Sequence, residues 1–560
     1  MKLKAFPRHR GTRVLAAVVA SAAVLSGCGR EIDYGEVTLP PAYTEAAPDP
    51  DATKEIQQET VIIPDLLAHD TYSPADAVID PMDHDETYQL EFSSDAQSYT
   101  SGLTGFNGTG FICLSDYACA SLIVTVPSSQ YYDLGIRLCS NKTKVAVIIG
   151  GTGTQVPSYD GTYTTVDGTE VGAVYAGEGN EFETYTLKGV YLNRGENRVT
   201  LQSLSGAAYI DELNVKNGST VPKLAYEVSN SPVDPNASMN TRIVKRYLAD
   251  VYGNRVITGQ FCSTGTETEI NAIYMSTGRY AAMRCSDIGI FTSHYDGYDK
   301  NDENEINTMI NWWKRGGLVN YSLYWYSPDD IKSSCFSKLT DFDLTKAVTD
   351  DEIAVLSPAS LEAYVKTGRV SHECAALIND MDIVAQKLKM LEAQDVPVLF
   401  RPLPEAGNGW YWWGCDADSG KWLYKFLFRR FTEYHRLTNI LWIWDGESYD
   451  YYPGDEYVDF VGMDMYVRSD ISGNSRMMDA IGYTIKSKGT ALTECGRIPS
   501  PDVIRRDGAY WLWFALWKGD YIINSNGTIQ YSHVTATELD KAYNNELYIT
   551  LDELPDFSRY

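Results

Sequence analysis

Apolar residues follow a period of two in the first part of this chain and a mixed pattern in the second. Between residues 86 and 217, short apolar runs are separated by Gly, Asn, Ser and Thr, and every second residue of Tyr132–Leu138 is apolar. This alternation is typical of strands with one face on a core and one face in water. Many short strands at this spacing predict an all-β, jelly-roll-like sandwich over residues 85–217.

From about residue 239 onward, strand-like and helix-like segments alternate. The clearest helical pattern covers residues 371–393, where apolar residues at steps of four and three form one stripe. Eight strands are expected, at Arg255–Cys262, Tyr280–Asp287, Leu318–Trp325, Val396–Pro402, Ile440–Asp445, Val458–Tyr466, Thr490–Cys495 and Ala509–Trp517. This alternation over residues 239–560 predicts a (β/α)8 TIM barrel, so the fold class is a β-sandwich module followed by a barrel.

The N-terminal residues have the features of a targeting signal. Basic residues precede an apolar, small-residue run from Val14 to Leu25, which leads to Ser26-Gly27-Cys28. The pattern resembles a bacterial lipoprotein signal, in which cleavage precedes the cysteine and lipid is attached to it. The resemblance implies a signal peptide over residues 1–27, lipidation of Cys28 and an anchor on the extracellular face of the bacterial cell membrane. An ordinary secretory signal with an incidental Cys28 is the alternative.

Two polar stretches separate these parts. Residues 28–84 are rich in Pro, Asp, Glu, Thr and Ala, a composition typical of a disordered tether. Residues 218–238 contain Ser-Pro and Asp-Pro and are expected to link the β module to the barrel.

Charge and cysteine content exclude several classes of function. The formal charge of −28 excludes nucleic acid as a partner and is compatible with a neutral polysaccharide. The ten cysteines are scattered and the seven histidines isolated, which excludes a transition-metal site. Cys113 and Cys119 are close enough in the chain for a local bridge. We expect the protein to act as a monomer.

The stretch Val396–Gly414, VPVLFRPLPEAGNGWYWWG, carries the strongest chemical signal. An apolar run typical of a buried parallel strand ends near Arg401 and Glu405, and four aromatic residues follow at 410–413. In α/β barrels this end of a strand is where catalysis is placed. Exposed aromatic faces beside a carboxylate would suit the C–H faces of sugar rings. The alternative is that the tryptophans are core and Glu405 is an ordinary loop acid.

Glu494 ends the seventh expected strand and lies 89 residues after Glu405. The ends of strands 4 and 7 face each other across the mouth of a closed barrel. Retaining glycoside hydrolysis needs two carboxyls about 5 Å apart, one protonated and one ionised. Their proximity would itself separate the two pKa values. The alternative is two unrelated glutamates on an acid-rich chain.

Several short motifs occur in order along residues 239–560. They are Val256-Ile-Thr-Gly-Gln260, Gly316-Gly-Leu-Val319, Arg401-Pro-Leu-Pro-Glu405, Gly409-Trp-Tyr-Trp-Trp-Gly414, Val461-Gly-Met-Asp-Met-Tyr466 and Thr493-Glu-Cys-Gly496. These motifs resemble glycoside hydrolase family 26, whose best-known members are β-mannanases. The resemblance implies an endo-β-1,4-mannanase that cleaves mannan or galactomannan with retention of configuration. No cofactor is expected for catalysis, because acid and nucleophile both come from the protein.

The resemblance also implies roles for individual residues. Glu405 is expected to be the general acid/base, Glu494 the nucleophile and Tyr466 a hydrogen-bond partner of the nucleophile. Arg401 would lie near the carboxylates and help to keep one ionised. The other substrate-contacting residues implied are Asp464, Trp410, Trp413, Trp517, Trp325 and Tyr324.

Two positions depart from the family pattern. Pro404 stands where the family usually has His before the acid/base, and Tyr324 stands where it tends to have His on strand 3. The two-glutamate mechanism is unaffected, but a mixed-linkage β-glucan or xylan stays open as the substrate. The rival from another class is a non-catalytic lipoprotein that captures polysaccharide at the cell surface.

The β-rich segment also resembles a known family. Tyr88-Gln-Leu-Glu-Phe92, Gly105–Phe111, Tyr132–Leu138, Gly195–Leu201 and Ile210–Val215 carry a resemblance to family 35 carbohydrate-binding modules. Such modules commonly hold Ca²⁺ between acids of the first and last strands. By position this implies Glu91 and Asp211, with Gln89 where the family usually has an acid. Ordinary surface acids are the alternative.

Overall fold

The computed structural model describes residues 82–158, 161, 163–328, 332–467 and 472–560. The predicted signal peptide, Cys28 and nearly all of the predicted tether lie outside these residues. Within the described ranges, no helix combines the length and the apolar character that crossing a membrane requires.

An antiparallel β domain at residues 85–217 is built around the long strand β5 (Gln130–Ile149). The first half of β5 pairs with β9 and β11, and its second half pairs with β8 and β10. The other strands are β1 (Asp85–Gln89), β2 (Ser98–Tyr99), β3 (Phe111–Leu114), β4 (Cys119–Val126), β6 (Gln155–Pro157), β7 (Thr164–Val166), β8 (Thr169–Glu178), β9 (Glu183–Leu192), β10 (Gly195–Ser205) and β11 (Ala208–Asn217).

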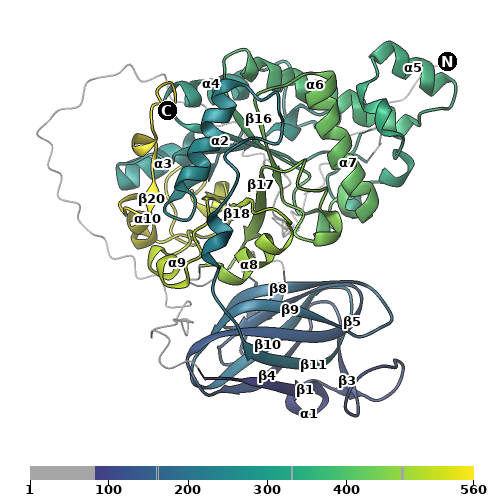
Figure 1. Ribbon diagram of the computed structural model, residues 1–560, viewed down its shortest axis with the longest axis vertical. Coiled ribbons are helices and arrows are strands. Elements are labelled where there is room, and N and C mark those ends of the chain that lie inside the picture. The colour runs from purple at the N-terminus through teal and green to yellow at the C-terminus, as the bar shows by residue number, and fades with distance from the viewer. Residues whose placement is uncertain (1–81, 159–160, 162, 329–331, 468–471) are drawn as a thin grey trace, which may run out of the picture.

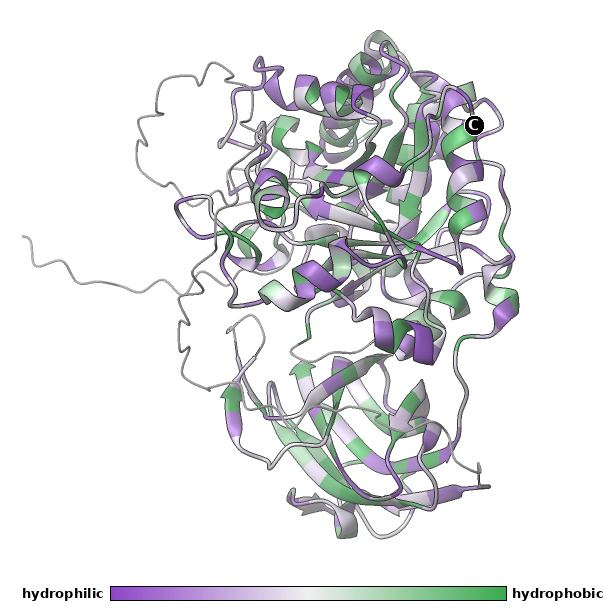
Figure 2. Ribbon diagram, turned by 90° about the vertical axis from the view of Figure 1, so that its left-hand side faces the viewer, coloured by the Kyte–Doolittle hydropathy of each residue, from purple (hydrophilic) through white to green (hydrophobic). Residues whose placement is uncertain are grey.

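The predicted strands of this domain are found, with several differences. The alternating apolar residues of Tyr132–Leu138 are buried as predicted, and Figure 2 shows apolar and polar bands along the strands. The sequence pattern predicts a first strand at Tyr88–Phe92, but β1 stops at Gln89, because a helical turn, α1 (Leu90–Ser93), buries Leu90. The strands predicted at Tyr131–Cys139 and Val145–Ile149 are both parts of β5, and β2, β6, β7 and β8 were not predicted. The jelly-roll-like arrangement and sugar binding stay predictions.

The predicted disulfide between Cys113 and Cys119 is wrong, because both are free thiols. Cys113 lies within β3 opposite Tyr209, whereas Cys119 lies at the start of β4 opposite Gln202. The two cysteines are therefore paired with different strands, β11 and β10.

Eight parallel strands close into a barrel, which confirms the predicted (β/α)8 fold. Each strand pairs with the next, and the last, β19, pairs with the first, β12. The strands are β12 (Val256–Phe261), β13 (Met283–Asp287), β14 (Leu318–Leu323), β15 (Val398–Pro402), β16 (Ile440–Trp444), β17 (Phe460–Met465), β18 (Gly489–Cys495) and β19 (Trp513–Leu516), and β20 (Tyr548–Ile549) pairs with β12 from outside.

Helices surround the barrel (Figure 1). They are α2 (Met239–Val251), α3 (Thr268–Thr277), α4 (Asn304–Lys314), α5 (Pro358–Lys366), α6 (His372–Glu392), α7 (Ala417–Arg429), α8 (Asn474–Gly482), α9 (Pro501–Asp507) and α10 (Ala536–Tyr543). The predicted helix at residues 371–393 is α6. The Ser371 side chain accepts from the Cys374 N–H and caps its first turn, and the predicted apolar stripe is buried.

The β domain lies beside the barrel, next to α8 (Figure 1). The Asn474 side chain at the start of α8 donates to the Gly189 carbonyl at 2.9 Å. Gly189 has φ 64°, and a Cβ there would come within 2.4 Å of the Asn474 amide nitrogen. Only glycine therefore allows this close approach of the two domains. Residues 218–238 run along the barrel, where the Val233 N–H donates to Asp459 at 2.9 Å.

A buried ion pair joins the barrel wall to its outer layer. The Arg284 guanidinium on β13 donates to Glu305 on α4 at 2.8 and 3.1 Å, and neither side chain is exposed. The Tyr321 hydroxyl donates to the same carboxylate at 3.1 Å. These donors offset the cost of removing two charges from water.

Replacing Arg284 by Met is expected to lower the free energy of unfolding by about 3–5 kcal/mol, because Glu305 loses its buried counter-ion. Urea unfolding followed by tryptophan fluorescence measures the change. The matched control, Lys366→Met, removes an exposed pair with Glu362 and is expected to leave the midpoint unchanged. Equal midpoints for both variants would contradict the assigned role of the pair.

Candidate active site

The Arg401 guanidinium is the centre of the candidate site. Arg401 lies on β15, and its side chain has no exposed area. It donates to Asp445 at 2.6 Å, to Asp464 at 2.6 Å and to Glu494 at 2.5 Å. These carboxylates lie at or near the carboxyl ends of β16, β17 and β18. One cation therefore draws together acids from three strands of the barrel mouth.

The Glu494 carboxyl has a second donor. The Tyr466 hydroxyl donates to one oxygen at 2.8 Å, while Arg401 binds the other. Burial raises the pKa of Glu494 above its usual range. The two donors act in the opposite direction, because each hydrogen bond favours the ionised form. The predicted contact between Tyr466 and Glu494 is thus present.

Glu405 lies in a tight loop that follows β15. Its backbone is left-handed, with φ 53°, and its N–H donates to the Asp445 carbonyl at 2.6 Å. Two residues later a Cβ on Gly407 would come within 2.5 Å of the Gly446 carbonyl, so glycine lets the loops after β15 and β16 touch. A left-handed backbone at a residue other than glycine is strained, and such strain is concentrated at functional sites.

Burial and neighbouring carboxylates keep a proton on Glu405. Burial, followed by the charges of Glu447 and Asp445, raises the pKa of Glu405 to about 8. Glu447 lies just after β16. One carboxylate oxygen each from Glu405, Glu447 and Asp464 lies within 4.8 Å of the others. Glu405 is therefore a protonated acid at neutral pH.

The arrangement joins both predicted catalytic glutamates to one network. Glu494 and Asp464 share Arg401, and Asp464 lies within 4.8 Å of Glu405, oxygen to oxygen. The Asp464 carboxyl also has a pKa well above its usual value, because it is buried and Arg401 only partly offsets the loss of water. A protonated carboxyl and an ion-paired carboxyl are therefore linked through Asp464 and Arg401.

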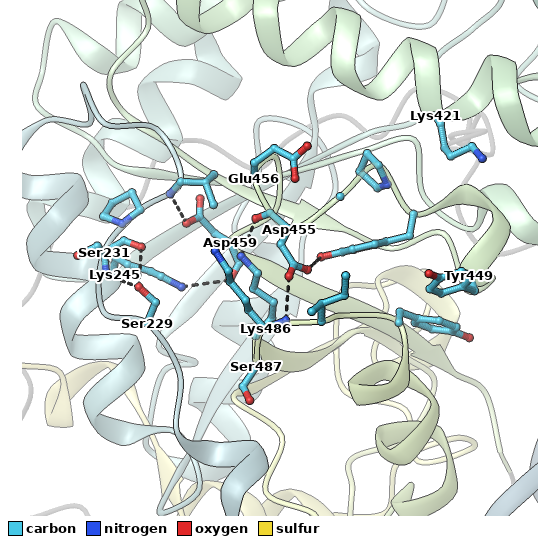
Figure 3. Close-up of a pocket in the computed structure, with 18 of the residues that line it drawn as sticks. Ser229, Ser231, Lys245, Lys421, Tyr449, Asp455, Glu456, Asp459, Lys486 and Ser487 are labelled. Atoms are coloured by element: carbon cyan, nitrogen blue, oxygen red, sulfur yellow. Dashed lines mark hydrogen bonds between the residues drawn. The ribbon is translucent and has the colours of Figure 1, made fainter.

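A separate cavity of about 740 Å³ lies away from this network. It is bounded by residues 229–233, by the loop at 449–456 and by residues 483–488, with Lys245 and Asp459 between them (Figure 3). The Lys245 ammonium donates to the Asp459 carbonyl at 3.1 Å. Neither Glu405 nor Glu494 lines this cavity.

A comparison with known protein families matches residues 233–553 to "Glycosyl hydrolase family 26". The chain belongs to glycosyl hydrolase family 26. It is therefore a glycoside hydrolase, as the resemblance predicted.

Curated relatives agree with this assignment. A mannan endo-1,4-beta-mannosidase of Thermothelomyces thermophilus is 28% identical over 465 residues, covering 80% of this chain and 86% of the relative. The Bacillus subtilis mannan endo-1,4-beta-mannosidase is 29% identical over 293 residues, covering 48% and 73%. Among solved structures, the Podospora anserina GH26-CBM35 beta-(1,4)-mannanase is 26% identical, with a TM-score of 0.52, and the match covers 85% of this chain and 100% of that one.

The aromatic residues of the family 26 site divide into two groups. Trp325 and Trp413 are almost completely buried, and their indole N–H groups donate to Asp380 and to the Pro404 carbonyl at 2.8 Å each. Their faces contact protein, so for Trp413 the alternative that the tryptophans at 410–413 are core fits this arrangement, and Trp325, expected to contact substrate, is buried as well. Trp410 is only partly buried. Trp517 retains 5% exposure and packs on Phe261.

Tyr324 contacts both Arg401 and Trp517. Its hydroxyl accepts from Arg401 at 3.1 Å, and its ring meets the ring of Trp517 edge to face. The sequence predicted Arg401, Asp464 and Tyr324 near the carboxylates, and the structure brings all three together with Glu494.

Two further acids of the site were not predicted from the sequence. Asp445 and Glu447 follow β16 directly, and both are buried beside the predicted pair. Their position at the carboxyl end of a barrel strand is the signal that would have found them. Lys144 and Tyr175, which contact Glu447, belong to the β domain, and no motif of the sequence placed them near the barrel mouth.

The three residues predicted for calcium also lie together. Buried oxygens of Gln89, Glu91 and Asp211 have no hydrogen-bond donor among the described residues. A Cβ on Gly108 would come within 2.4 Å of Glu91 and 2.7 Å of Gln89 side-chain oxygens, so both surround the same point. The Asn107 N–H donates to Asp211 at 2.9 Å. The Arg137 guanidinium donates to the same Asp211 oxygen as Asn107, so only the other Asp211 oxygen would be shared with a cation. Together with the oxygens of Gln89 and Glu91 it is the kind of ligand that a hard cation such as Ca²⁺ prefers.

Glu405→Gln is expected to raise the melting temperature, by an amount that grows between pH 4.5 and about 8. The folded chain keeps the Glu405 proton up to the raised pKa of about 8, whereas the unfolded chain loses it near pH 4.5. Wild-type stability therefore falls across this window, and glutamine, which does not ionise, removes the loss. Thermal unfolding at stepped pH measures it.

Glu447→Gln is the control for this measurement. The charges of Lys144 and Arg476 lower the pKa of Glu447 despite its burial. Ionised Glu447 therefore stabilises the folded chain above its ordinary pKa, and this stabilisation is lost as the pH falls. This variant is expected to be less stable than wild type at neutral pH. A pH-independent gain for Glu405→Gln would contradict the assigned protonation.

Proposed function

We propose that the protein is an endo-β-1,4-mannanase that hydrolyses mannan and galactomannan with retention of configuration. The observation that carries the proposal is the carboxyl network, in which Glu405 holds a proton and Glu494 is ion-paired with Arg401. The names of the relatives, mannan endo-1,4-beta-mannosidases, support mannan as the substrate.

The reaction proceeds in two displacements. Glu405 gives its proton to the glycosidic oxygen while a Glu494 oxygen attacks the anomeric carbon, which breaks the glycosidic bond and forms a glycosyl ester. Glu405, now ionised, takes a proton from water as that water attacks the same carbon. The ester bond breaks, Glu494 returns to its carboxylate, and the two inversions give net retention.

The neighbouring residues hold this chemistry in place. Arg401 and Tyr466 keep the Glu494 carboxylate oriented for attack, because each binds a different oxygen. Asp464 lies near Glu405, shares Arg401 with Glu494 and would line the cleft. Trp410 and Trp517 keep some exposed area and are the aromatic residues that would contact sugar rings.

The substrate is less tightly constrained than the mechanism. Pro404 and Tyr324 replace the histidines expected from the family pattern, which leaves mixed-linkage β-glucan or xylan as the alternative. A panel of mannan, galactomannan, mixed-linkage glucan and xylan, assayed for reducing ends, decides between them. Release from mannan above the others supports the proposal, and release from glucan or xylan alone would overturn the mannanase assignment.

For the β domain we propose carbohydrate binding and a structural Ca²⁺ at Gln89, Glu91 and Asp211. Support comes from the "GH26-CBM35" arrangement named for the Podospora anserina structure, all of which is covered by the match to this chain. We also propose a monomer, anchored through lipid on Cys28 to the extracellular face of the bacterial cell membrane. Family membership argues against a lipoprotein that only captures polysaccharide.

Glu494→Ala is expected to abolish turnover of mannan, to less than a few per cent of wild type, while mannan binding survives. The glycosyl ester cannot form without the carboxylate. Azide is expected to restore cleavage of an activated aryl β-mannoside and to give the α-azide, because it attacks in place of Glu494.

Glu405→Ala is the matched variant. With the same activated substrate the ester still forms, so azide is expected to give the β-azide after two inversions. Detection of the α-azide from both variants would contradict the assignment of the two roles.

Removal of calcium is expected to lower the melting temperature by several degrees, because a cation that binds only the folded state stabilises it. Differential scanning fluorimetry in Ca²⁺ and in EGTA measures the difference. Glu91→Gln should abolish it, whereas Glu196→Gln, at an exposed acid of β10, should retain it. Equal melting temperatures in Ca²⁺ and EGTA for wild type would contradict the site.

A further inference from the structure

The β domain reaches the catalytic carboxyl network. The Tyr175 hydroxyl on β8 donates to Glu447 at 2.5 Å, and the Lys144 ammonium on β5 lies 3.8 Å from the same oxygen. Glu447 belongs to the barrel, and its carboxylate lies within 4.8 Å of Glu405, oxygen to oxygen. Tyr175 and Lys144 of the β domain therefore contact a residue, Glu447, that itself lies beside Glu405, the proposed acid of the barrel domain.

These contacts are buried and connected to one another. The side chain of Lys144 is 12% exposed and that of Glu447 1%. The Lys144 ammonium also lies over the rings of Tyr175 and Trp410, at 4.8 and 5.6 Å from their centroids. A buried cation, a buried hydroxyl and a buried carboxylate satisfy each other only while the domains stay docked.

The barrel holds the same carboxylate from its own side. The Asp464 N–H donates to Glu447 at 3.1 Å, and the Asn408 amide donates at 3.3 Å. Arg476 on α8 adds a second positive charge. The acidic or phenolic groups that also face Glu447 are Glu405, Asp445, Asp464, Asp479 and Tyr483.

We propose that Tyr175 and Lys144 are positioning residues of the family 26 active site, which hold Glu447 beside Glu405 and so make the β domain part of the catalytic centre. The proposal rests on the proposed role of Glu405 as acid/base. It assigns the β domain a task in the chemical step in addition to any binding of polysaccharide.

The electrostatics give this positioning a consequence. The charge of Lys144 and the Tyr175 hydrogen bond both favour the Glu447 anion, which lowers its pKa. The Glu447 anion in turn raises the pKa of Glu405, after burial the largest cause. Without the Tyr175 hydroxyl the Glu447 anion is no longer held beside Glu405, so its charge acts on Glu405 less strongly and the pKa of Glu405 falls.

The interface provides a matched control. The Tyr131 hydroxyl on β5 donates to Asp507, at the end of α9, at 2.7 Å and also joins the two domains. The groups that act on this hydroxyl are Asp507 and Arg506, and neither belongs to the catalytic carboxyl network. Tyr131→Phe and Tyr175→Phe each remove a partly buried tyrosine hydroxyl that interacts with one acid and one arginine of the barrel domain, Asp507 and Arg506 or Glu447 and Arg476, but only the second acts on Glu447.

The test compares pH profiles of kcat/KM on mannan for the full-length variants. Tyr175→Phe is expected to move the basic limb down by about one pH unit, so that kcat/KM falls about tenfold at pH 9 and changes little at pH 6. Tyr131→Phe is expected to have the wild-type kcat/KM at both pH 6 and pH 9. An unchanged profile for Tyr175→Phe, or an equal loss at every pH, would overturn the proposal. Tyr175 is preferred to Lys144, because the lysine charge also acts directly on Glu405 and lowers its pKa, as it lowers the pKa of Glu447.

A second measurement separates this inference from the mannanase proposal. The pH dependence of the difference in melting temperature that Glu405→Gln causes reports the pKa of Glu405 without any substrate. Glu405→Gln is introduced into wild type and into Tyr175→Phe, and the gain in melting temperature is measured against pH for each. In the Tyr175→Phe background this gain is expected to stop growing about one pH unit lower. If the protein does not hydrolyse mannan but Tyr175→Phe still lowers the pKa of Glu405, only the proposed substrate is overturned. If Tyr175→Phe leaves the pKa of Glu405 unchanged, the positioning role is overturned.

Discussion

A single buried guanidinium organises the catalytic end of the barrel. Arg401 binds three carboxylates, from Asp445, Asp464 and Glu494, and has no exposed area. Because one positive charge cannot neutralise this many acids out of water, the network is stable only if protons are retained in it. The site therefore holds an acid and a carboxylate at the same time, which is the condition that glycoside hydrolysis with retention requires.

The positions of the protons follow from which carboxyls have cations nearby. Glu494 has the direct ion pair with Arg401, and Glu447 has Lys144 and Arg476. Glu405 lies among acids, and burial together with their charges outweighs the nearby cations, so its pKa is raised. Since Lys144 comes from the β domain, the docking of two separately built domains contributes to the charge pattern of one active site.

The sequence predicted the barrel and its two glutamates, because buried strands show as runs with few charged residues, and Glu405 follows one such run while Glu494 lies near the end of another. Strand β8 was missed because Gly172 and Gly177 interrupt its apolar pattern, and Tyr175 was missed with it. The burial of Trp413 was not predictable, because it depends on where its loop turns and on an acceptor at Pro404. Contacts between domains depend on the docked arrangement, which local spacing does not encode.

The most direct test of the account is to trap the glycosyl ester. Incubation with an activated 2-deoxy-2-fluoro-β-mannoside slows hydrolysis of the ester, and mass spectrometry of a proteolytic digest then locates the sugar. The account predicts the added mass on the peptide that contains Glu494, and none on the peptide that contains Glu405. A label on Glu405, or turnover with inversion and no label, would contradict it.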